Sequence, residues 1–285
     1  MKEPLKNLLH ILLDAIKYIF IISFCIIIIY PLLYAVLGSF KSNYDVMLGG
    51  RLLPEQWMFY NYVEAWQQFD FLLYTRNSIL LGAGVALISL FVSSMAGYCI
   101  SRREFWGRKL LKKTILATMF ISIGTVTLRP IYLLMVKVKL HNSLWPVVLI
   151  IVSANMGTYI FLISRFINTV PRELDEAATI DGAKPFRIYY QIIIPLIRPI
   201  LGVVGLFSFR AAWNDYINAN VFTMSKPYLR PLTVGVVSLR YGVMAAAQWH
   251  IMLAGASMSI IPMLIVYAFT NKTFIAGLSE GAVKG

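Results

Sequence analysis

The stretch SLWPVVLIIVSANMGTYIFLIS, residues 143–164, runs for 22 residues without an Asp, Glu, Lys or Arg side chain. About 20 apolar residues at the helical rise are enough to cross the hydrocarbon core of a bilayer. Comparable charge-free runs occupy residues 18–40, 77–100 and 251–271. These four runs predict four membrane-spanning helices, and the mean hydropathy of +0.71 agrees with that class of protein.

Two further apolar runs are interrupted by charged side chains. Residues 114–136 contain Arg129, and residues 199–224 contain Arg210 and Asp215. A charged side chain at the centre of a membrane helix costs about 2.5–3.5 kcal/mol on insertion scales, so each of these charges requires a reason. With these two runs included, the sequence predicts an all-α membrane protein of six transmembrane helices.

The distribution of Lys and Arg between the loops predicts an orientation. If the N-terminus is cytoplasmic, the cytoplasmic segments hold 16 of these residues and the external segments hold 8. Because cytoplasmic loops carry the excess of positive charge, both termini are expected in the cytoplasm. The net charge of +13 is then explained mainly by the Lys and Arg residues that orient the protein in the membrane. The basic loop 102–113 is expected to face anionic lipid, and no nucleic-acid partner is expected. The six helices are expected to form a single transmembrane domain over residues 1–285.

The sequence offers no reactive cluster. Its three histidines, His10, His141 and His250, are scattered and show no metal-ligand spacing. It contains no phosphate-binding glycine loop, no dinucleotide fingerprint and no nucleophile elbow. We therefore expect a protein that is not itself an enzyme, with no catalytic residue, no metal site and no cofactor bound by this chain.

The loop of residues 165–198, RFINTVPRELDEAATIDGAKPFRIYYQIIIPLIR, is polar and charged between two apolar runs. Acidic residues gather where a short helix would begin, and there the helix dipole favours carboxylates: Glu173, Asp175 and Glu176. Gly182 is placed to end that helix, because glycine adopts the left-handed conformation of a C-terminal cap. Pro185 suits the first turn of a second helix. The loop is thus predicted to be a helix-turn-helix between the fourth and fifth spans.

The same loop carries a resemblance to a known family. A Glu-Ala-Ala, Gly, Ile, aliphatic, Pro pattern at this spacing resembles the signature of ABC importer permease subunits, and it is formed here by Glu176, Ala177, Ala178, Gly182, Ile192, Ile194 and Pro195. Ile194 stands where the family usually has leucine, which is a conservative departure. Other segments are similar to the carbohydrate-uptake, maltose-type branch: PIYLL at 130–134, NSLW at 142–145, WNDY at 213–216 and the tail at 277–285.

The resemblance, which extends from the first span to the last residue, implies a coupling helix that rests in a groove of an ATPase subunit. The residues that it assigns to this contact are Asp175, Glu176, Ala177, Ala178, Asp181 and Gly182. The small alanines would allow close approach, and Glu176 would pair with a basic residue of the groove. The tail is implied as a second contact with the ATPase, through Gly281, Lys284 and Gly285.

The resemblance also implies the assembly. It consists of a second, homologous permease, two copies of a cytoplasmic ATPase that hold ATP and Mg, and an external solute-binding protein. ATP-driven closure of the ATPases would rotate the spans and give alternating access to an oligosaccharide in the bacterial plasma membrane. A long external segment, residues 41–76, is rich in aromatic side chains. It is either an interfacial aromatic belt or a docking surface for the delivery protein.

A polar stripe in the fifth predicted span is a hypothesis for the substrate path. Arg210, Trp213 and Asn214 fall at i, i+3 and i+4, so they share one helical face, and Asn218 extends it. Asp215 lies on a different face from Arg210. Guanidinium and amide groups suit sugar hydroxyls, and an indole suits stacking on a pyranose. The alternatives are polar contacts between helices or snorkelling of the charges towards the interface.

Arg129 is the other intramembrane arginine, and Pro130 after it offers a reason for a break in the helix. Arginines at positions 129 and 210 in one path would suit an acidic oligosaccharide. Three pairs of small residues, among them Gly82 with Ala86 and Ser93 with Gly97, have the spacing of helix-packing faces. These faces seat either neighbouring spans or a partner permease.

Three alternative functions are open at this point. An amino-acid or peptide permease would share the loop signature but not the carbohydrate-type tail. A channel or ion-gradient transporter would work without an ATPase and leaves the Glu176 loop without a role. A membrane-embedded enzyme would need a reactive cluster at one membrane face, and the sequence offers none.

Overall fold

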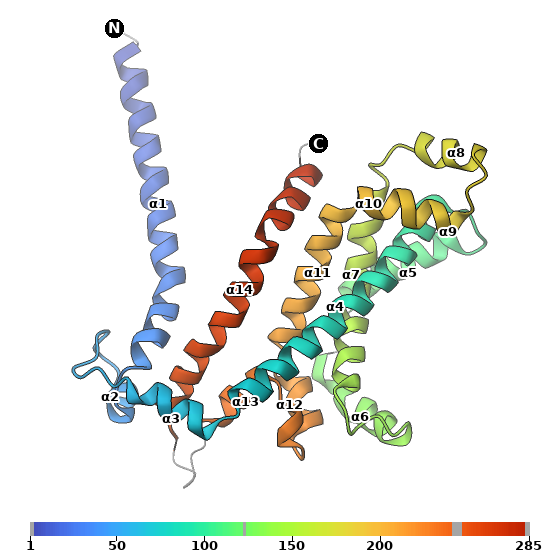
Figure 1. Cartoon of the computed structure of the whole chain (residues 1–285). Coiled ribbons are helices and arrows are strands. Elements are labelled where there is room, and N and C mark those ends of the chain that lie inside the picture. The colour runs from blue at the N-terminus through green and yellow to red at the C-terminus, as the bar shows by residue number, and fades with distance from the viewer. Residues whose placement is uncertain (1–2, 122–123, 241–246, 283–285) are drawn as a thin grey trace. The chain divides into compact units, whose positions relative to one another are not determined.

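The computed structural model describes residues 3–121, 124–240 and 247–282, and within them the regular secondary structure is helical (Figure 1). The chain forms two compact units. One comprises Met1–Phe69 and Val236–Ile260, and the other comprises Asp70–Gly235 and Ile261–Gly285. The single transmembrane domain expected over residues 1–285 stays a prediction.

Four helices are long and apolar enough to cross a membrane, and they coincide with the four charge-free runs. They are α1 (Glu3–Gly38), α4 (Phe71–Arg102), α7 (Trp145–Ile167) and α14 (Trp249–Ala282), of which the apolar windows in α1 and α14 are Ile11–Gly38 and Trp249–Ala268. Two bent pairs of helices bring the number of possible spans in the described residues to six. An all-helical membrane protein is therefore confirmed, with four clear spans.

The third predicted span, residues 114–136, is divided between two helices. They are α5 (Arg108–Phe120) and α6 (Leu128–Lys137), with a short 3-10 turn, η1 (Gly124–Thr127), before α6. Gly124 has a φ of 61°, in the left-handed region that suits glycine and not a continuing right-handed helix. Pro130 is tolerated in the first turn of α6, so the chain breaks before Arg129 and not at it.

The fifth predicted span, residues 199–224, is not one continuous helix. Helix α11 (Arg198–Trp213) ends early, and a separate helix, α12 (Ile217–Thr223), follows. The carboxylate of Asp215 accepts a hydrogen bond from the Ala219 N–H at 2.8 Å. It thereby satisfies one of the N–H groups that have no acceptor within the first turn of α12. Towards the N-terminus, the helical run Pro185–Leu196 meets α11 at an angle of 81°.

That run is itself composite. It consists of α9 (Pro185–Ile188), a π-helical turn, η2 (Tyr189–Ile193), and α10 (Ile194–Leu196). The start of α9 at Pro185 is as predicted from the sequence. Helix α8 (Glu173–Ile180) precedes it, so the loop contains the predicted helix, turn and second helical segment.

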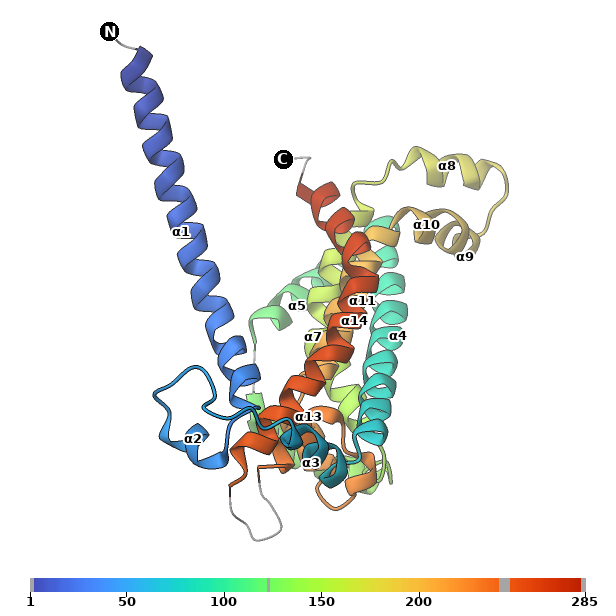
Figure 2. The same ribbon diagram turned by 60° about the vertical axis from the view of Figure 1, so that its left-hand side comes forward.

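The core of the second unit is formed by α4, α7 and α11, which lie side by side (Figure 2). Small residues in α4 allow α11 and α7 to pack closely against it. A Cβ atom added to Gly82 would lie 2.6 Å from Cε2 of Phe209 in α11, and one added to Gly97 would lie 2.9 Å from Cγ2 of Ile163 in α7. Two of the small residues singled out in the sequence therefore seat neighbouring spans of the same chain.

The second unit is completed by short elements, η3 (Pro227–Leu229) and the beginning of α13 (Leu232–Ser238). The side-chain amide of Asn77, in α4, donates to the carbonyl oxygens of Tyr228 and Arg230 at 2.8 and 3.0 Å. The hydroxyl of Ser78 accepts the Leu232 N–H at 2.8 Å. These bonds hold the segment that follows α12 against α4.

The first unit contains α1, α2 (Asn43–Leu48) and α3 (Tyr60–Gln68). Phe40 packs against the rings of Trp57, Phe59 and Tyr62 at centroid distances of 5.1–5.3 Å. The aromatic residues of the 41–76 segment thus build a local core together with Phe40. Along α1, by contrast, the described apolar side chains up to Leu33 are exposed.

Candidate functional site

Helix α8 lies on the 165–198 loop and has a well-defined C-terminal cap. Gly182 has a φ of 78°, the Gly182 N–H donates to the Thr179 carbonyl at 3.0 Å, and the Ala183 N–H donates to the Ala178 carbonyl at 2.9 Å. This pair of bonds is the Schellman motif, which requires a left-handed residue. The prediction that Gly182 ends the helix is confirmed. The acidic residues also lie in the first turn, as predicted.

The two faces of α8 differ sharply. Ala178 is buried and Asp175 is half-buried, and these two residues, three apart, face the protein. Leu174, Ala177 and Ile180 are exposed, and Ala177 and Ile180 point away from the buried side. Ile180 is 88% exposed although it is apolar. Glu176, Asp181 and Gly182, which the sequence also assigned to the site, are exposed as well.

Ile180 was missed by the sequence reasoning, which looked at charge and small size. The sequence feature that could have identified Ile180 is its spacing from two other apolar residues. Leu174, Ala177 and Ile180 are spaced by three residues, so they form a small apolar stripe on a helix of only eight residues. Contiguous exposed apolar surface rimmed by polar residues can mark an interaction site, so this stripe is a candidate contact surface.

The inner face of α8 is bound to the end of α4 through Arg102. The Asp175 Oδ2 atom lies 2.8 Å from Arg102 Nε, and the two side chains are 18% and 4% exposed. Arg102 Nη2 also donates to the Val170 carbonyl at 2.7 Å, just before α8. The Ser101 hydroxyl donates to the Ser164 carbonyl of α7 at 3.0 Å. The last turn of α4 thus holds both α8 and the end of α7.

This ion pair corrects the role predicted for Asp175. The sequence assigned Asp175 to the ATPase contact, whereas in the structure its carboxylate is paired with Arg102. Arg102 was assigned no role beyond that of a basic loop residue. Its partner lies 73 positions along the chain, so no local pattern could reveal the pair. A buried ion pair of this kind is costly to break, because one charge is then left buried and unpaired.

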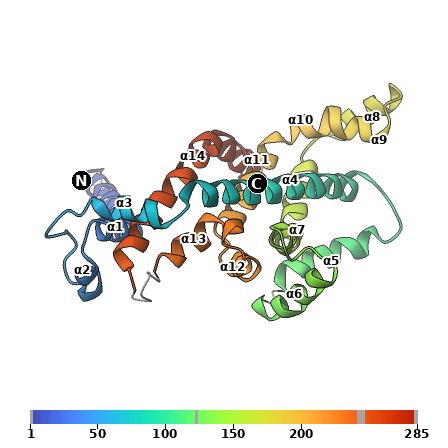
Figure 3. The ribbon, with the colours of Figure 1, turned by 60° about the horizontal axis from the view of Figure 1, so that its bottom comes forward.

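The second arm of the loop contacts α4 one and two turns earlier. The Tyr189 hydroxyl is hydrogen-bonded to the Ser94 hydroxyl at 2.7 Å, and the rings of Tyr189 and Tyr98 lie 5.4 Å apart. Phe186 and Tyr190 of the same arm are 66% exposed. Figure 3 shows the α8–α10 segment beside the end of α4. The loop is therefore attached to α4 at two places and leaves its outer side open.

The residues predicted for the substrate path are only partly brought together. Arg210 and Asn214 are both exposed and lie one turn apart at the end of α11, where the Asn214 N–H donates to the Arg210 carbonyl at 3.0 Å. Trp213 is buried, and its ring stacks on Phe209 at 5.7 Å. Its carbonyl accepts the Thr233 hydroxyl at 2.6 Å. The indole is packed inside the protein and does not share the open face with Arg210.

Asn218, which was expected to extend the stripe, contacts Asp215 instead. The Asn218 amide donates to Asp215 Oδ2 at 2.6 Å, and Asp215 Oδ1 accepts the Ala219 N–H. Asn218 belongs to α12, so the expected extension of the face along one helix is wrong: the helix ends at Trp213. Arg129 is exposed in the first turn of α6. The roles of these side chains in transport stay predictions.

The predicted contact at the C-terminal tail is mostly outside the described residues. Gly281 falls within the last turn of α14, while Lys284 and Gly285 lie outside the part of the chain that the structure describes. The part of the chain with described side chains contains no group of three metal-ligating residues. The site is therefore the outer face of α8 and its attachment to α4.

Comparison with known proteins identifies the family. The family model described as "Binding-protein-dependent transport system inner membrane component" matches residues 89–273. The chain belongs to this family. It is a permease component of an ABC transporter and a multi-pass protein of the bacterial inner membrane.

Curated relatives match more than four fifths of the length of this permease. The melibiose/raffinose/stachyose import permease protein MelC of Bacillus subtilis (strain 168) is 33% identical, over 82% of this chain and 84% of that protein. The arabinooligosaccharides transport system permease protein AraQ of Halalkalibacterium halodurans is 29% identical, over 91% and 92% of the two chains. The resemblance seen in the sequence is confirmed by these matches.

The fold of this permease also has a counterpart among solved structures. A chain of a bacterial ABC transporter involved in the import of the acidic polysaccharide alginate matches with a TM-score of 0.77. The match covers 92% of this chain and 96% of that one, at 23% sequence identity. At this identity, the likeness is one of fold.

Proposed function

We propose that this permease carries an oligosaccharide across the membrane by alternating access, driven by ATPase subunits that dock on α8. Relatives named for the import of melibiose, raffinose and stachyose and for arabinooligosaccharides support the substrate class. The excess of Lys and Arg in the loops on the α8 side supports a cytoplasmic location for this loop and for both termini.

The observation that carries the proposal is the arrangement of α8. Its outer face presents an exposed apolar stripe of Leu174, Ala177 and Ile180, while its inner face is held to α4 by the pair of Arg102 with Asp175. A force applied to the outer face therefore reaches a membrane span through a buried ion pair and not through a free loop. This is what a coupling helix between an ATPase and a span requires.

The assembly follows from the presence of one such loop per chain. Two ATPase copies require two coupling loops, so a second, homologous permease completes the complex. ATP and Mg are bound by the ATPases, and this chain binds no cofactor. An external solute-binding protein delivers the substrate, and the tail around Gly281, Lys284 and Gly285 makes a second contact with the ATPases.

The open face at the end of α11 is proposed as part of the substrate path. Arg210 and Asn214 offer a guanidinium and an amide to sugar hydroxyls. Trp213 supports this face from inside, and Asp215 with Asn218 shapes the turn that follows it. Together with Arg129, Arg210 favours an acidic oligosaccharide, a hypothesis that fails if Ala at both positions leaves uptake of acidic oligosaccharides unchanged.

The docking role is tested with Ile180→Asp in the complete complex reconstituted with its ATPases and binding protein. A carboxylate on the exposed stripe should prevent close approach of the ATPase, so transport and binding-protein-stimulated ATP hydrolysis should fall at least tenfold. Ile180→Leu keeps the apolar surface and serves as the control. Glu176→Lys tests the charge of the same face. Full coupling in both Ile180→Asp and Glu176→Lys would contradict docking at α8.

The competing class is a transporter driven by an ion gradient. It predicts uptake by vesicles that contain the permeases without the ATPases. Our proposal predicts no uptake until the ATPases and ATP are added. An amino-acid or peptide permease would instead show uptake of those solutes in the same assay.

A further inference from the structure

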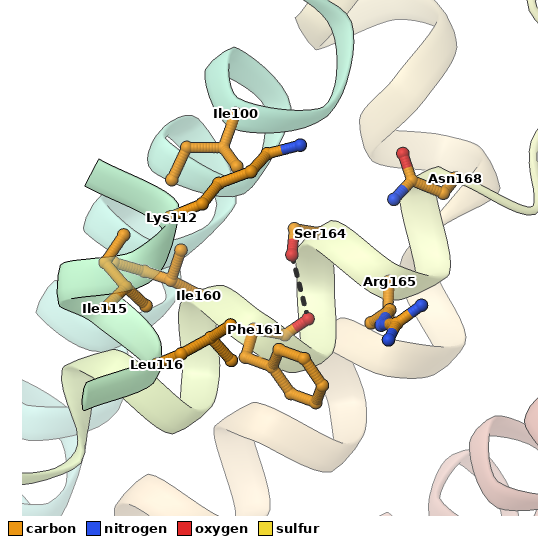
Figure 4. Close-up of a pocket in the computed structure, with 9 residues that line it drawn as sticks. All are labelled: Ile100, Lys112, Ile115, Leu116, Ile160, Phe161, Ser164, Arg165 and Asn168. Atoms are coloured by element: carbon orange, nitrogen blue, oxygen red, sulfur yellow. Dashed lines mark hydrogen bonds between the residues drawn. The ribbon is translucent and has the colours of Figure 1, made fainter. Parts of the chain in front are cut away.

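A cavity of about 220 Å³ lies between α5, the last half of α7 and the end of α4 (Figure 4). Its lining shares no residue with the polar stripe of α11, and no step of the proposed transport cycle uses it. Its lining combines polar and apolar side chains from the three helices: Ile100, Lys112, Ile115, Leu116, Ile160, Phe161, Ser164, Arg165 and Asn168.

The two ends of the lining differ. In Figure 4 the ammonium group of Lys112 and the amide of Asn168 lie towards one end, with Ile100 beside Lys112, while Leu116, Phe161 and the Arg165 guanidinium lie towards the other. The polar end corresponds to the start of α5 and the end of α7, where the spans leave the membrane. An amphipathic cavity at this depth suits a ligand with a charged head and an apolar chain.

The charge of the cavity has one sign. Lys112 and Arg165 contribute two cations, and the lining contains no acidic residue. The Arg165 guanidinium lies over the Phe161 ring at 5.4 Å. Lys112 is half-buried and, among the described residues, forms neither a hydrogen bond nor an ion pair. A half-buried ammonium without an acceptor favours an anionic ligand.

The shape of the cavity follows from how α5 packs on α7. A Cβ atom added to Gly157 would lie 2.7 Å from the Thr118 hydroxyl oxygen, so the helices are in close contact at that level. One to three turns further, at Lys112 and Arg165, the same pair of helices lines an open space. The opening therefore lies between the close contact and the membrane surface, where a lipid headgroup and the start of its chain are found.

We propose that this cavity binds an anionic glycerophospholipid of the surrounding membrane. Lys112 contacts the phosphate, Ser164 and Asn168 contact the glycerol oxygens, and an acyl chain runs along Leu116, while the Arg165 guanidinium over the Phe161 ring adds attraction for the anionic headgroup. Charge complementarity selects an anionic headgroup over a zwitterionic one. The bound lipid holds α5 against α7 beside the end of α4.

The test is lipid retention measured by native mass spectrometry on the full-length permease purified with its partner subunits. The delipidated complex is titrated with phosphatidylglycerol or with phosphatidylcholine of the same acyl chains. Each cation near a membrane surface changes lipid affinity about fivefold, so Lys112→Gln or Arg165→Gln should weaken phosphatidylglycerol binding about fivefold and the double variant about thirtyfold. Lys113→Gln, on the same helix but exposed and outside the lining, should weaken phosphatidylglycerol binding less than Lys112→Gln does.

Three outcomes overturn the proposal. The first is equal retention of phosphatidylglycerol and phosphatidylcholine by the unchanged complex, which needs no variant to fold. The second is unchanged binding in the double variant. The third is displacement of the bound lipid by millimolar glycerol phosphate without acyl chains, which would assign the cavity to a free phosphate. Lys112→Arg keeps the charge and should retain the lipid, which separates loss of charge from damage to α5.

Discussion

The loop of residues 165–198 and the segment of residues 199–224 adjoin in the sequence, yet they differ in how local patterns become structure. In the loop, the predicted helix ends at the predicted glycine, and its polar side chains are sorted into an inner and an outer face. In the following segment, the polar stripe predicted from one helical period is divided by a turn after Trp213.

A helix cap and a shared helical face depend on different parts of the structure. A cap such as Gly182 is decided by the backbone within one turn, so the sequence specifies it directly. A shared helical face holds only while the helix continues, and continuation is decided by contacts elsewhere. Here the carboxylate of Asp215 accepts the Ala219 N–H, and α12 begins instead of a further turn of α11.

The largest expected effect concerns the attachment of α8, because it tests whether the loop moves together with α4. Arg102→Gln leaves the half-buried Asp175 carboxylate unpaired, where breaking a fully buried pair costs about 3–5 kcal/mol. We expect at least a tenfold loss of transport per ATP hydrolysed in the reconstituted complex, with the ATPases still active. Arg172→Gln, an exposed arginine at the start of the same helix, serves as the matched control.

The same pair offers a sharper comparison. In the double variant Arg102→Gln with Asp175→Asn, neither buried charge is left unpaired, so coupling should be better than in Arg102→Gln alone. A double variant as impaired as the sum of the two single variants would show that the residues act independently. The loop would then not transmit force through this pair. The sorting of its side chains into an inner and an outer face, which distinguishes it from the α11 segment, would then have no role in coupling.

The sequence predicted those parts of the fold that are written in consecutive residues. The runs at 18–40, 77–100, 143–164 and 251–271 became helices because burial in lipid needs only a long apolar stretch. The break in the third span was predicted at Pro130 and lies earlier, near Gly124, and the break after Trp213 was not predicted, because hydropathy averages over such breaks. The site was predicted in its position, its acidic start and its cap.

Two features of the site depend on residues distant in sequence and could not be predicted from one chain. Arg102 pairs with Asp175 across 73 positions. Trp213 is buried because Phe209 stacks on it, and Phe209 is in turn seated against Gly82 of another helix. Helical period alone placed Trp213 on the open face with Arg210, and only the packing of α4 on α11 reveals that it points inward.

An intermediate effect is expected where that packing is disturbed. Gly82→Ala places a methyl group 2.6 Å from the Phe209 ring, and overpacking of this kind costs about 1–3 kcal/mol. We expect a lower midpoint of thermal unfolding in detergent, together with altered fluorescence of Trp213. Gly84→Ala is the matched control, because its methyl group would lie 3.7 Å from the nearest atom of Val148. Equal effects of both variants would mean that Phe209 does not fix the end of α11.

The smallest expected effect distinguishes the two roles open to Asp215. As the acceptor for the Ala219 N–H in the first turn of α12 it should tolerate Asn, whose side-chain oxygen accepts the same bond, while Asp215→Ala should cost about 0.5–2 kcal/mol, as for loss of a capping acceptor. Faster hydrogen exchange of the Ala219 amide in Asp215→Ala, with near-native exchange and transport in Asp215→Asn, would assign the residue to the turn. If Asp215→Asn kept the stability and lost transport, the charge itself would act on the substrate. The break after Trp213 would then bring Asp215, which the helical period had placed on a different face from Arg210, into the substrate path.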